Sequence, residues 1–166
     1  MSFRKICAYT AKVIPEITAE AHCDIPCGIY DPTPAKIAAK TIQRMAMQLK
    51  ELKPPQDWND EHERLAYVNA VARRVAVKES HAKTCELELV TLWADFFKAE
   101  HFVADSMLHE RFWKTMQLCS KNMQNVDEKL AEELVSAVDE IAKIFYEKKN
   151  APDKFDAYKK ITDTLF

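Results

Sequence analysis

Residues 126–149, VDEKLAEELVSAVDEIAKIFYEKK, carry the clearest fold signal in this 166-residue chain. Within them, large apolar residues recur at every third or fourth position: Leu130, Leu134, Val138, Ile141 and Phe145. This spacing predicts one long amphipathic helix with a single buried face. Asn150-Ala151-Pro152 follows and should end the helix, because proline cannot continue it.

The same spacing recurs earlier in the chain. A first helix should begin at Thr33-Pro34, as N-cap and first helical residue, and end before Pro54-Pro55. Its expected buried stripe is Ile37, Thr41/Ile42, Met45, Leu49 and Leu52. Lys36 and its neighbouring basic residues fall away from this stripe, and we read Lys36 and Lys98 as part of a solvated surface.

A second helix should follow a cap at Asp57 or Asn59, with a kink near Ser80. Its expected buried face is Leu65, Val68, Val71/Ala72, Val75, Cys85, Leu89, Leu92/Trp93 and Phe96. Residues 99–105 are predicted to be a connection. A third helix then carries Leu108, Phe112, Met116, Cys119 and Met123. Cys85 and Cys119 fall in these apolar patterns, so we expect them to be core residues.

Composition supports an all-α protein. The chain has one glycine and no Asn-Gly or Asp-Gly dipeptide, which β-hairpin turns commonly use. We therefore predict an antiparallel four-helix bundle over residues 33–149, with an N-terminal metal-binding hook and a C-terminal tail helix over residues 150–166. A formal net charge of −2 gives no basic footprint for nucleic acid, and no window is apolar enough to cross a membrane.

Residues 1–21 are read as a separate leader. They lack the continuous apolar run of a secretory signal, and Glu16 and Glu20 argue against a transit peptide, so we expect a cytoplasmic protein. Ala19-Glu20-Ala21 is a small-residue setting where a peptidase could cut.

Residues 22–32, HCDIPCGIYDP, hold two of the five cysteines and the only glycine. Cleavage before His22 would free an amine that, with the Cys23 amide nitrogen and the Cys23 and Cys27 thiolates, forms a compact N2S2 plane. Planar nitrogen and sulfur ligation favours nickel or copper over zinc. Such strong donors would also stabilise a higher oxidation state, which makes a one-electron Ni(II)/Ni(III) couple reasonable. Spacing alone leaves open a cysteine-containing loop with no chemistry.

This segment resembles the nickel hook of the nickel superoxide dismutase family, still attached to its leader. Further similarities lie in Leu92-Trp93-Ala94-Asp95-Phe96-Phe97-Lys98, His101-Phe102 and Ile144-Phe145. The resemblance implies a homohexameric four-helix bundle with one nickel ion per subunit. It also implies disproportionation of superoxide to dioxygen and hydrogen peroxide, after a dedicated peptidase exposes the new amino terminus.

The resemblance assigns site residues one by one. It places the metal ligands at His22, Cys23 and Cys27, with the His22 imidazole axial in the oxidised state. Pro26 matches a cis proline that closes the hook, Tyr30 matches the tyrosine that guards access to nickel, and Asp24 matches a residue whose backbone N–H faces the substrate pocket.

Three positions depart from the family pattern. Ala38 and His81 stand where some members have a glutamate and an arginine that hold the axial imidazole, and Phe96 stands where some have a second pocket tyrosine.

Three functional hypotheses follow. The first is a nickel superoxide dismutase made as an inactive precursor, in which the uncleaved chain has no native nickel site because the His22 nitrogen is still an amide. The second is a non-catalytic nickel- or copper-binding helical protein. The third is a structural bundle with an incidental cysteine loop.

Overall fold

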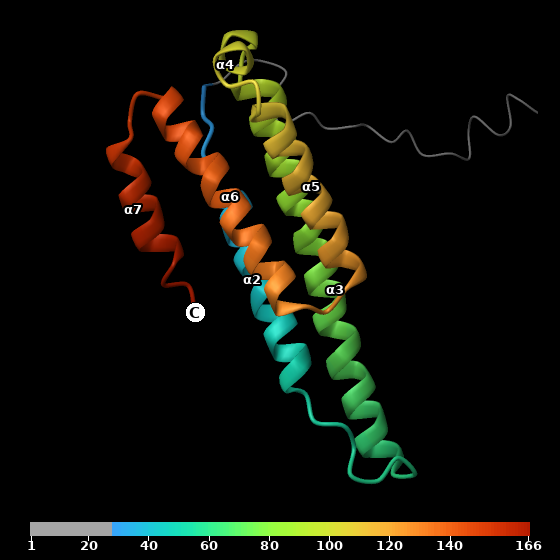
Figure 1. Cartoon of the computed structure of the whole chain (residues 1–166). Coiled ribbons are helices and arrows are strands. Elements are labelled where there is room, and N and C mark those ends of the chain that lie inside the picture. Colours follow the sequence, from blue (N-terminus) through green and yellow to red (C-terminus); the bar gives the residue numbers. More distant parts are fainter. Residues whose placement is uncertain (1–27) are drawn as a thin grey trace, which may run out of the picture.

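The computed structural model describes residues 28–166, and in that range every regular element is a helix (Figure 1). The elements are α2 (Thr33–Glu51), α3 (Glu61–Thr91), a single wide π-helical turn η1 (Leu92–Phe96), α4 (Ala99–Ala104), α5 (Leu108–Gln124), α6 (Glu128–Lys148) and α7 (Asp153–Thr162). The predicted all-α class is confirmed. Residues 99–105, predicted to be a connection, instead contain the short helix α4.

The four long helices form a closed ring of neighbours. α2 packs on α3 and α6, and α5 packs on α3 and α6. Successive long helices run in opposite directions, as Figure 1 shows. This is the predicted antiparallel four-helix bundle. α7 lies outside the bundle, against α6 and α2.

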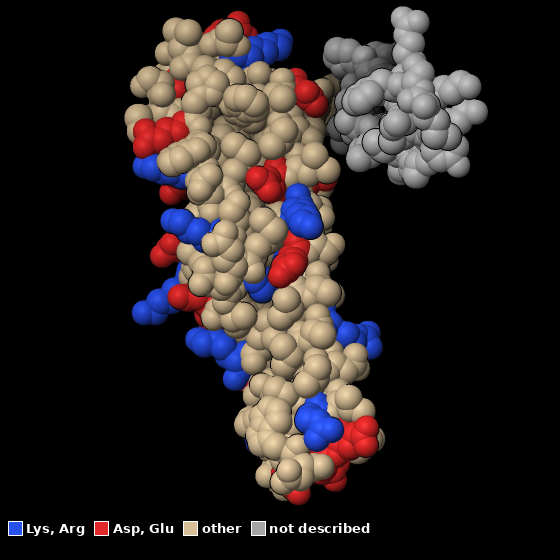
Figure 2. Space-filling view, turned by 90° about the vertical axis from the view of Figure 1, so that its right-hand side faces the viewer, with Lys and Arg blue, Asp and Glu red and all other residues tan. Residues whose placement is uncertain are grey.

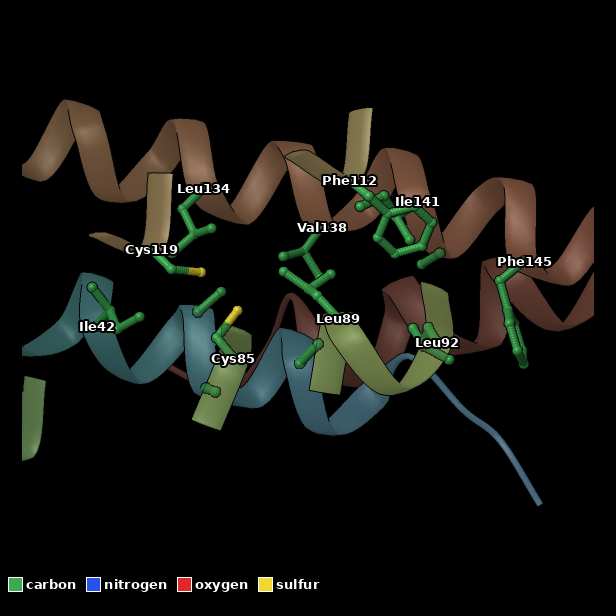
Figure 3. Packing of buried hydrophobic residues seen from close by; sticks show 14 of the residues in the cluster. Ile42, Cys85, Leu89, Leu92, Phe112, Cys119, Leu134, Val138, Ile141 and Phe145 are labelled. Carbon is green, nitrogen blue, oxygen red and sulfur yellow. The ribbon is translucent and has the colours of Figure 1, made fainter. Parts of the chain in front are cut away.

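The core lies between the facing stripes of the four helices (Figure 3). Its largest apolar members are almost fully buried: Ile42, Leu89, Leu108, Phe112, Leu134, Val138, Ile141 and Phe145. Burying a side chain of this size contributes about 1.5–3 kcal/mol each. Cys85 and Cys119 are also fully buried, which confirms their predicted place in the core.

The predicted burial of the first part of α3 is wrong. Leu65 and Val68 are 57% and 52% exposed. The α2–α3 hairpin extends beyond the ends of α5 and α6 (Figure 1), so these turns of α3 have only the end of α2 and the connecting loop beside them. Apolar spacing predicted the helix correctly but could not show where its neighbours stop.

Both ends of α3 also differ from prediction. The N-cap is Asp60 rather than Asp57 or Asn59, since its carboxylate accepts a hydrogen bond from the Glu63 N–H at 3.0 Å. α3 continues unbroken through Ser80.

The regular helix ends instead at η1, where the Phe97 N–H donates to the Leu92 carbonyl, five residues earlier, at 3.0 Å. This wide turn shifts the helical register. Phe97 is therefore buried, whereas Trp93, expected at the core position beside Leu92, is 38% exposed.

The buried face of α2 is built from smaller residues than predicted. Four alanines accompany Ile42 in the core, whereas Ile37 is 44% exposed. Lys36, predicted to be solvated, is fully buried because α7 lies over it. The predicted tail helix is confirmed as α7, with Tyr158 buried and Ile161 65% exposed.

The outer surface is mixed in charge. On the face drawn in Figure 2, basic and acidic side chains are interspersed among uncharged residues. Within residues 28–166, none of the helices has both the length and the apolar content that crossing a membrane requires.

Candidate metal centre

The structure describes only the second part of the hook, from Gly28 onward. His22, Cys23, Asp24, Pro26 and Cys27 lie outside the described residues, so their sequence-based roles stay predictions. Gly28 is the first residue described, and its φ of 68° lies in the left-handed region that glycine adopts without strain. The chain's only glycine therefore stands at a position whose backbone conformation favours glycine.

Tyr30 lies where the hook joins the bundle. Its side chain is half-buried, and its ring centroid is 6.0 Å from that of Phe96. It borders a hollow of about 200 Å³ between the start of α2 and the end of α3, lined also by Ile29, Asp31, Pro34, Glu88, Thr91 and Leu92. The predicted access residue therefore borders a small cavity on the side of the bundle from which the hook extends.

Asp31 ties this segment to two helices. One carboxylate oxygen accepts hydrogen bonds from the Thr33 N–H at 2.8 Å and from the Thr33 hydroxyl, at the positive end of the α2 dipole. The other accepts from the Tyr146 hydroxyl at 2.9 Å. Burial, together with this hydrogen bond to Asp31, raises the pKa of Tyr146 above its usual value. Tyr146 is thus a neutral donor at physiological pH.

Lys149, the residue that ends α6, makes a second contact with the same segment. Its Nζ donates to the Tyr30 carbonyl at 2.8 Å and lies 5.0 Å from the centre of the Phe145 ring. No sequence motif pointed to a role for Lys149 or Tyr146. The available signal was their place at the end of the strongest apolar stripe, with Tyr146 directly after Phe145 and Lys149 four positions after it.

The three departures from the family pattern are all described. Ala38 is buried in the α2 face. His81 has a buried Nδ1 with no hydrogen-bond partner within residues 28–166. Phe96 packs against Phe145 at 4.3 Å and Phe97 at 5.0 Å between ring centroids, so the neighbour of Tyr30 is part of the aromatic core.

Two histidines at this end of the molecule have structural partners. His101 accepts a hydrogen bond from the Lys98 N–H at 3.1 Å through Nδ1, at the start of α4. The Trp93 indole N–H donates to the Nδ1 of His109 at 2.9 Å, and the Phe102 ring stacks on His109 at 3.9 Å. Both imidazoles thus have structural contacts near the starts of α4 and α5.

The chemistry of the donor set determines which segment suits nickel. Residues 28–166 contain no group of three or more His, Cys, Asp or Glu side chains placed to hold a metal ion. A hydrogen bond with Cys119 and burial raise the pKa of Cys85 well above its usual value, so this core thiol stays protonated and is a poor ligand. After a cleavage before His22, the predicted ligands His22, Cys23 and Cys27 would offer amine, amide and imidazole nitrogen together with thiolate sulfur, a donor set that suits nickel.

This chain has a helical bundle that follows a short segment rich in nitrogen and sulfur donors. These two features together are those of a helical-bundle metalloprotein. Residues 17–149 match the model of the family described as nickel-containing superoxide dismutase. The match spans both the hook and the four long helices, and the chain belongs to this family.

Two relatives are similar over most of their length. The chain is 30% identical to "Superoxide dismutase [Ni]" of Streptomyces coelicolor and 29% identical to that of Streptomyces seoulensis, in each case over 82% of this chain and 95% of the relative.

Solved structures of nickel superoxide dismutase are also similar to this chain. The chain is similar to nickel superoxide dismutase with the nickel ligation of the oxidised state, at a TM-score of 0.67 and 28% identity, over 78% of this chain and 100% of the other. A native structure of nickel superoxide dismutase gives a TM-score of 0.66 over the same shares of the two chains.

Proposed function

We propose that this chain is a nickel-dependent superoxide dismutase that disproportionates superoxide to dioxygen and hydrogen peroxide once its leader has been removed. The observation that carries the proposal is a family match that includes the hook as well as the bundle, from residue 17 to residue 149. The division into a leader (1–21), a hook (22–32), a bundle (33–149) and a tail (150–166) is part of the proposal.

The ligands in this proposal are His22, Cys23 and Cys27, with Asp24 and Pro26 shaping the loop between the two cysteines. Nickel bound there supplies the one-electron couple that the reaction needs. Removing residues 1–21 changes the His22 nitrogen from an amide to an amine, and an amine is a much better donor near neutral pH. The cleavage thus switches on metal binding.

Tyr30 is proposed to control access to the metal. Its half-buried ring borders the hollow at the start of α2. Phe96, at 6.0 Å, supports the ring with an apolar surface and brings no second phenol. The Tyr30 hydroxyl is therefore the group we propose to order water and the incoming anion.

The test compares two forms of the protein, the full-length chain and a chain starting at His22, each loaded with nickel. Only the trimmed form should hold about one nickel per subunit and consume superoxide in pulse radiolysis. Cys27→Ser in the trimmed form should lose both properties, and the core variant Cys119→Ser is the matched thiol control. Native nickel binding by the full-length chain, or a preference of the trimmed chain for zinc, would contradict the proposal.

The alternative is a nickel- or copper-binding protein without turnover. The same experiment separates the two, because that protein would bind the metal after trimming and leave superoxide untouched.

We also propose a homohexamer, a dedicated processing peptidase and a cytoplasmic location. Large apolar side chains on α3 and α5 are exposed in the single chain, and an interface that covered them would remove them from water: Leu87, Val90 and Trp113. Native mass spectrometry of the trimmed protein measures the subunit number. Mass spectrometry of the protein from its natural source shows where the chain is cut. Cell fractionation tests the compartment.

A further inference from the structure

Two side chains at the C-terminal end of α6 contact the segment that joins the hook to the bundle. In Figure 1 the start of the described chain runs beside the last turns of α6 before it enters α2. Two side chains from that end, Tyr146 and Lys149, bond the two adjacent residues Tyr30 and Asp31, more than 110 positions away in sequence.

We propose that Tyr146 and Lys149 are positioning residues that fix the Tyr30–Asp31 segment, and that they thereby hold the base of the hook against the bundle. The nickel-related part of this inference rests on the proposed function. The mechanical part does not, because it concerns only residues whose contacts are described.

The two bonds act on successive residues, one through a backbone carbonyl and the other through a side-chain carboxylate. Lys149 holds the Tyr30 carbonyl at 2.8 Å, and Tyr146 holds the Asp31 carboxylate at 2.9 Å. Asp31 in turn accepts from the Thr33 N–H, so the chain is fixed on the C-terminal side of Tyr30 down to the first turn of α2. Movement of the Tyr30–Asp31 backbone away from the end of α6 would require at least one of these bonds to break.

Tyr146 is itself held in place by packing. Tyr146 is 4% exposed, and its ring contacts Phe145 at 5.2 Å and Tyr158 at 5.9 Å between centroids. Phe145 also contacts Phe96, the neighbour of Tyr30. The end of α6 therefore sets both the backbone of Tyr30 and the surface on which its ring lies.

The chain offers a matched pair of variants for the test. Tyr146→Phe removes a buried hydroxyl that donates to a carboxylate at 2.9 Å near the hook. Tyr158→Phe removes an equally buried hydroxyl that donates to Asp139 at 2.9 Å, away from the hook. Lys149→Met, which keeps the apolar stem over Phe145, pairs in the same way with Lys143→Met at an exposed site of α6.

Hydrogen exchange of the full-length protein without metal is the first measurement. A bond to a carboxylate that holds a segment in place corresponds to about ten-fold slower opening, so Tyr146→Phe should exchange the Thr33 amide about ten-fold faster. Tyr158→Phe should leave that amide unchanged. Equal protection of this amide in Tyr146→Phe and the wild type would overturn the inference.

The second measurement uses the trimmed protein loaded with nickel, and follows both release of the metal to a chelator and the electron paramagnetic resonance signal of the oxidised state. Tyr146→Phe and Lys149→Met should release nickel at least about three-fold faster and shift the signal, while their paired controls should not. Unchanged release and spectra would overturn the hook-holding role. Failure of the wild type to bind nickel would instead refute the proposed function, and the exchange result would still stand.

Discussion

Lys36 shows how a single residue can differ from its sequence pattern for a clear physical reason. Its ammonium is fully buried and lies 2.6 and 2.7 Å from the two Asp139 carboxylate oxygens and 3.2 Å from Asp163. Asp139 also accepts from Lys159 at 2.6 Å and from the Tyr158 hydroxyl at 2.9 Å. The buried charge is tolerated because several opposite charges and hydrogen bonds surround it.

We predict that Lys36→Met lowers the free energy of unfolding by about 3 kcal/mol, at the low end of the range for breaking a buried ion pair. The loss is moderated because Asp139 keeps Lys159 and Tyr158 as partners. Urea denaturation of the full-length chain measures the change.

Lys50→Met is the control for this prediction. Lys50 pairs with Glu128 at 3.3 Å at an exposed site, where ion pairs contribute at most about 1 kcal/mol. If both variants unfolded at the same urea concentration, the ion pairs of Lys36 with Asp139 and Asp163 would have no stabilising role.

At the scale of the element, the end of α5 depends on a side chain from another helix. Helix C-termini leave carbonyl groups without intrahelical donors. Here the buried Lys78 of α3 donates to the carbonyls of Asn122, Met123 and Asn125, the latter two at 2.9 Å each. Burial lowers the pKa of Lys78, and the three carbonyl dipoles solvate its charge in place of water.

Replacing Lys78 by methionine should lower the free energy of unfolding by about 2–4 kcal/mol, because one buried and two partly buried carbonyl acceptors lose a charged donor at once. The loss should be local at first, so amide exchange across the α5–α6 turn should become faster before the rest of the bundle is affected. Lys83→Met, at an exposed site on α3, is the control. Unchanged exchange in that turn would show that Lys78 does not cap α5.

At the scale of the whole molecule, two buried tyrosines connect the hook base, the bundle and α7. Burial is the first cause that raises the pKa of both Tyr146 and Tyr158 above the ordinary 10.0, and their hydrogen bonds to Asp31 and Asp139 add to it. Above pH 10 the unfolded chain therefore loses these protons while the folded chain keeps them. Their stabilising contribution is complete below that pH and is lost as the pH rises.

We therefore predict that the free energy of unfolding falls above pH 10, by up to about 1.4 kcal/mol per pH unit for each tyrosine. Lys159 adds to this loss above pH 10.5, since its bonds to Asp139 and Asp163 outweigh burial and raise its pKa. Lys40 and Lys78, whose pKa values burial lowers, act in the opposite direction below that pH.

Urea titrations between pH 8 and pH 11 measure the slope. The double variant Tyr146→Phe/Tyr158→Phe should be less stable at pH 8 and should show a shallower decline above pH 10. A double variant with the same slope as the wild type would exclude the two tyrosines as its origin.

The sequence by itself determined the long helices and the bundle, and it predicts the chemistry of the hook. Apolar residues at every third or fourth position require a helix with one buried face, whatever that face meets, so α6 and the core cysteines were predicted correctly. The donors of residues 22–32 are adjacent in sequence, so their resemblance to a nickel hook needed no knowledge of packing.

Only the tertiary structure decided which neighbour each face meets. Leu65 is exposed because its part of the hairpin extends past α5 and α6, and Lys36 is buried because α7 covers it. The contacts of Tyr146 and Lys149 with the hook base join residues more than 110 positions apart, and no local pattern encodes such a pairing. Helix formation depends on nearby residues, whereas burial and positioning depend on how distant segments come together.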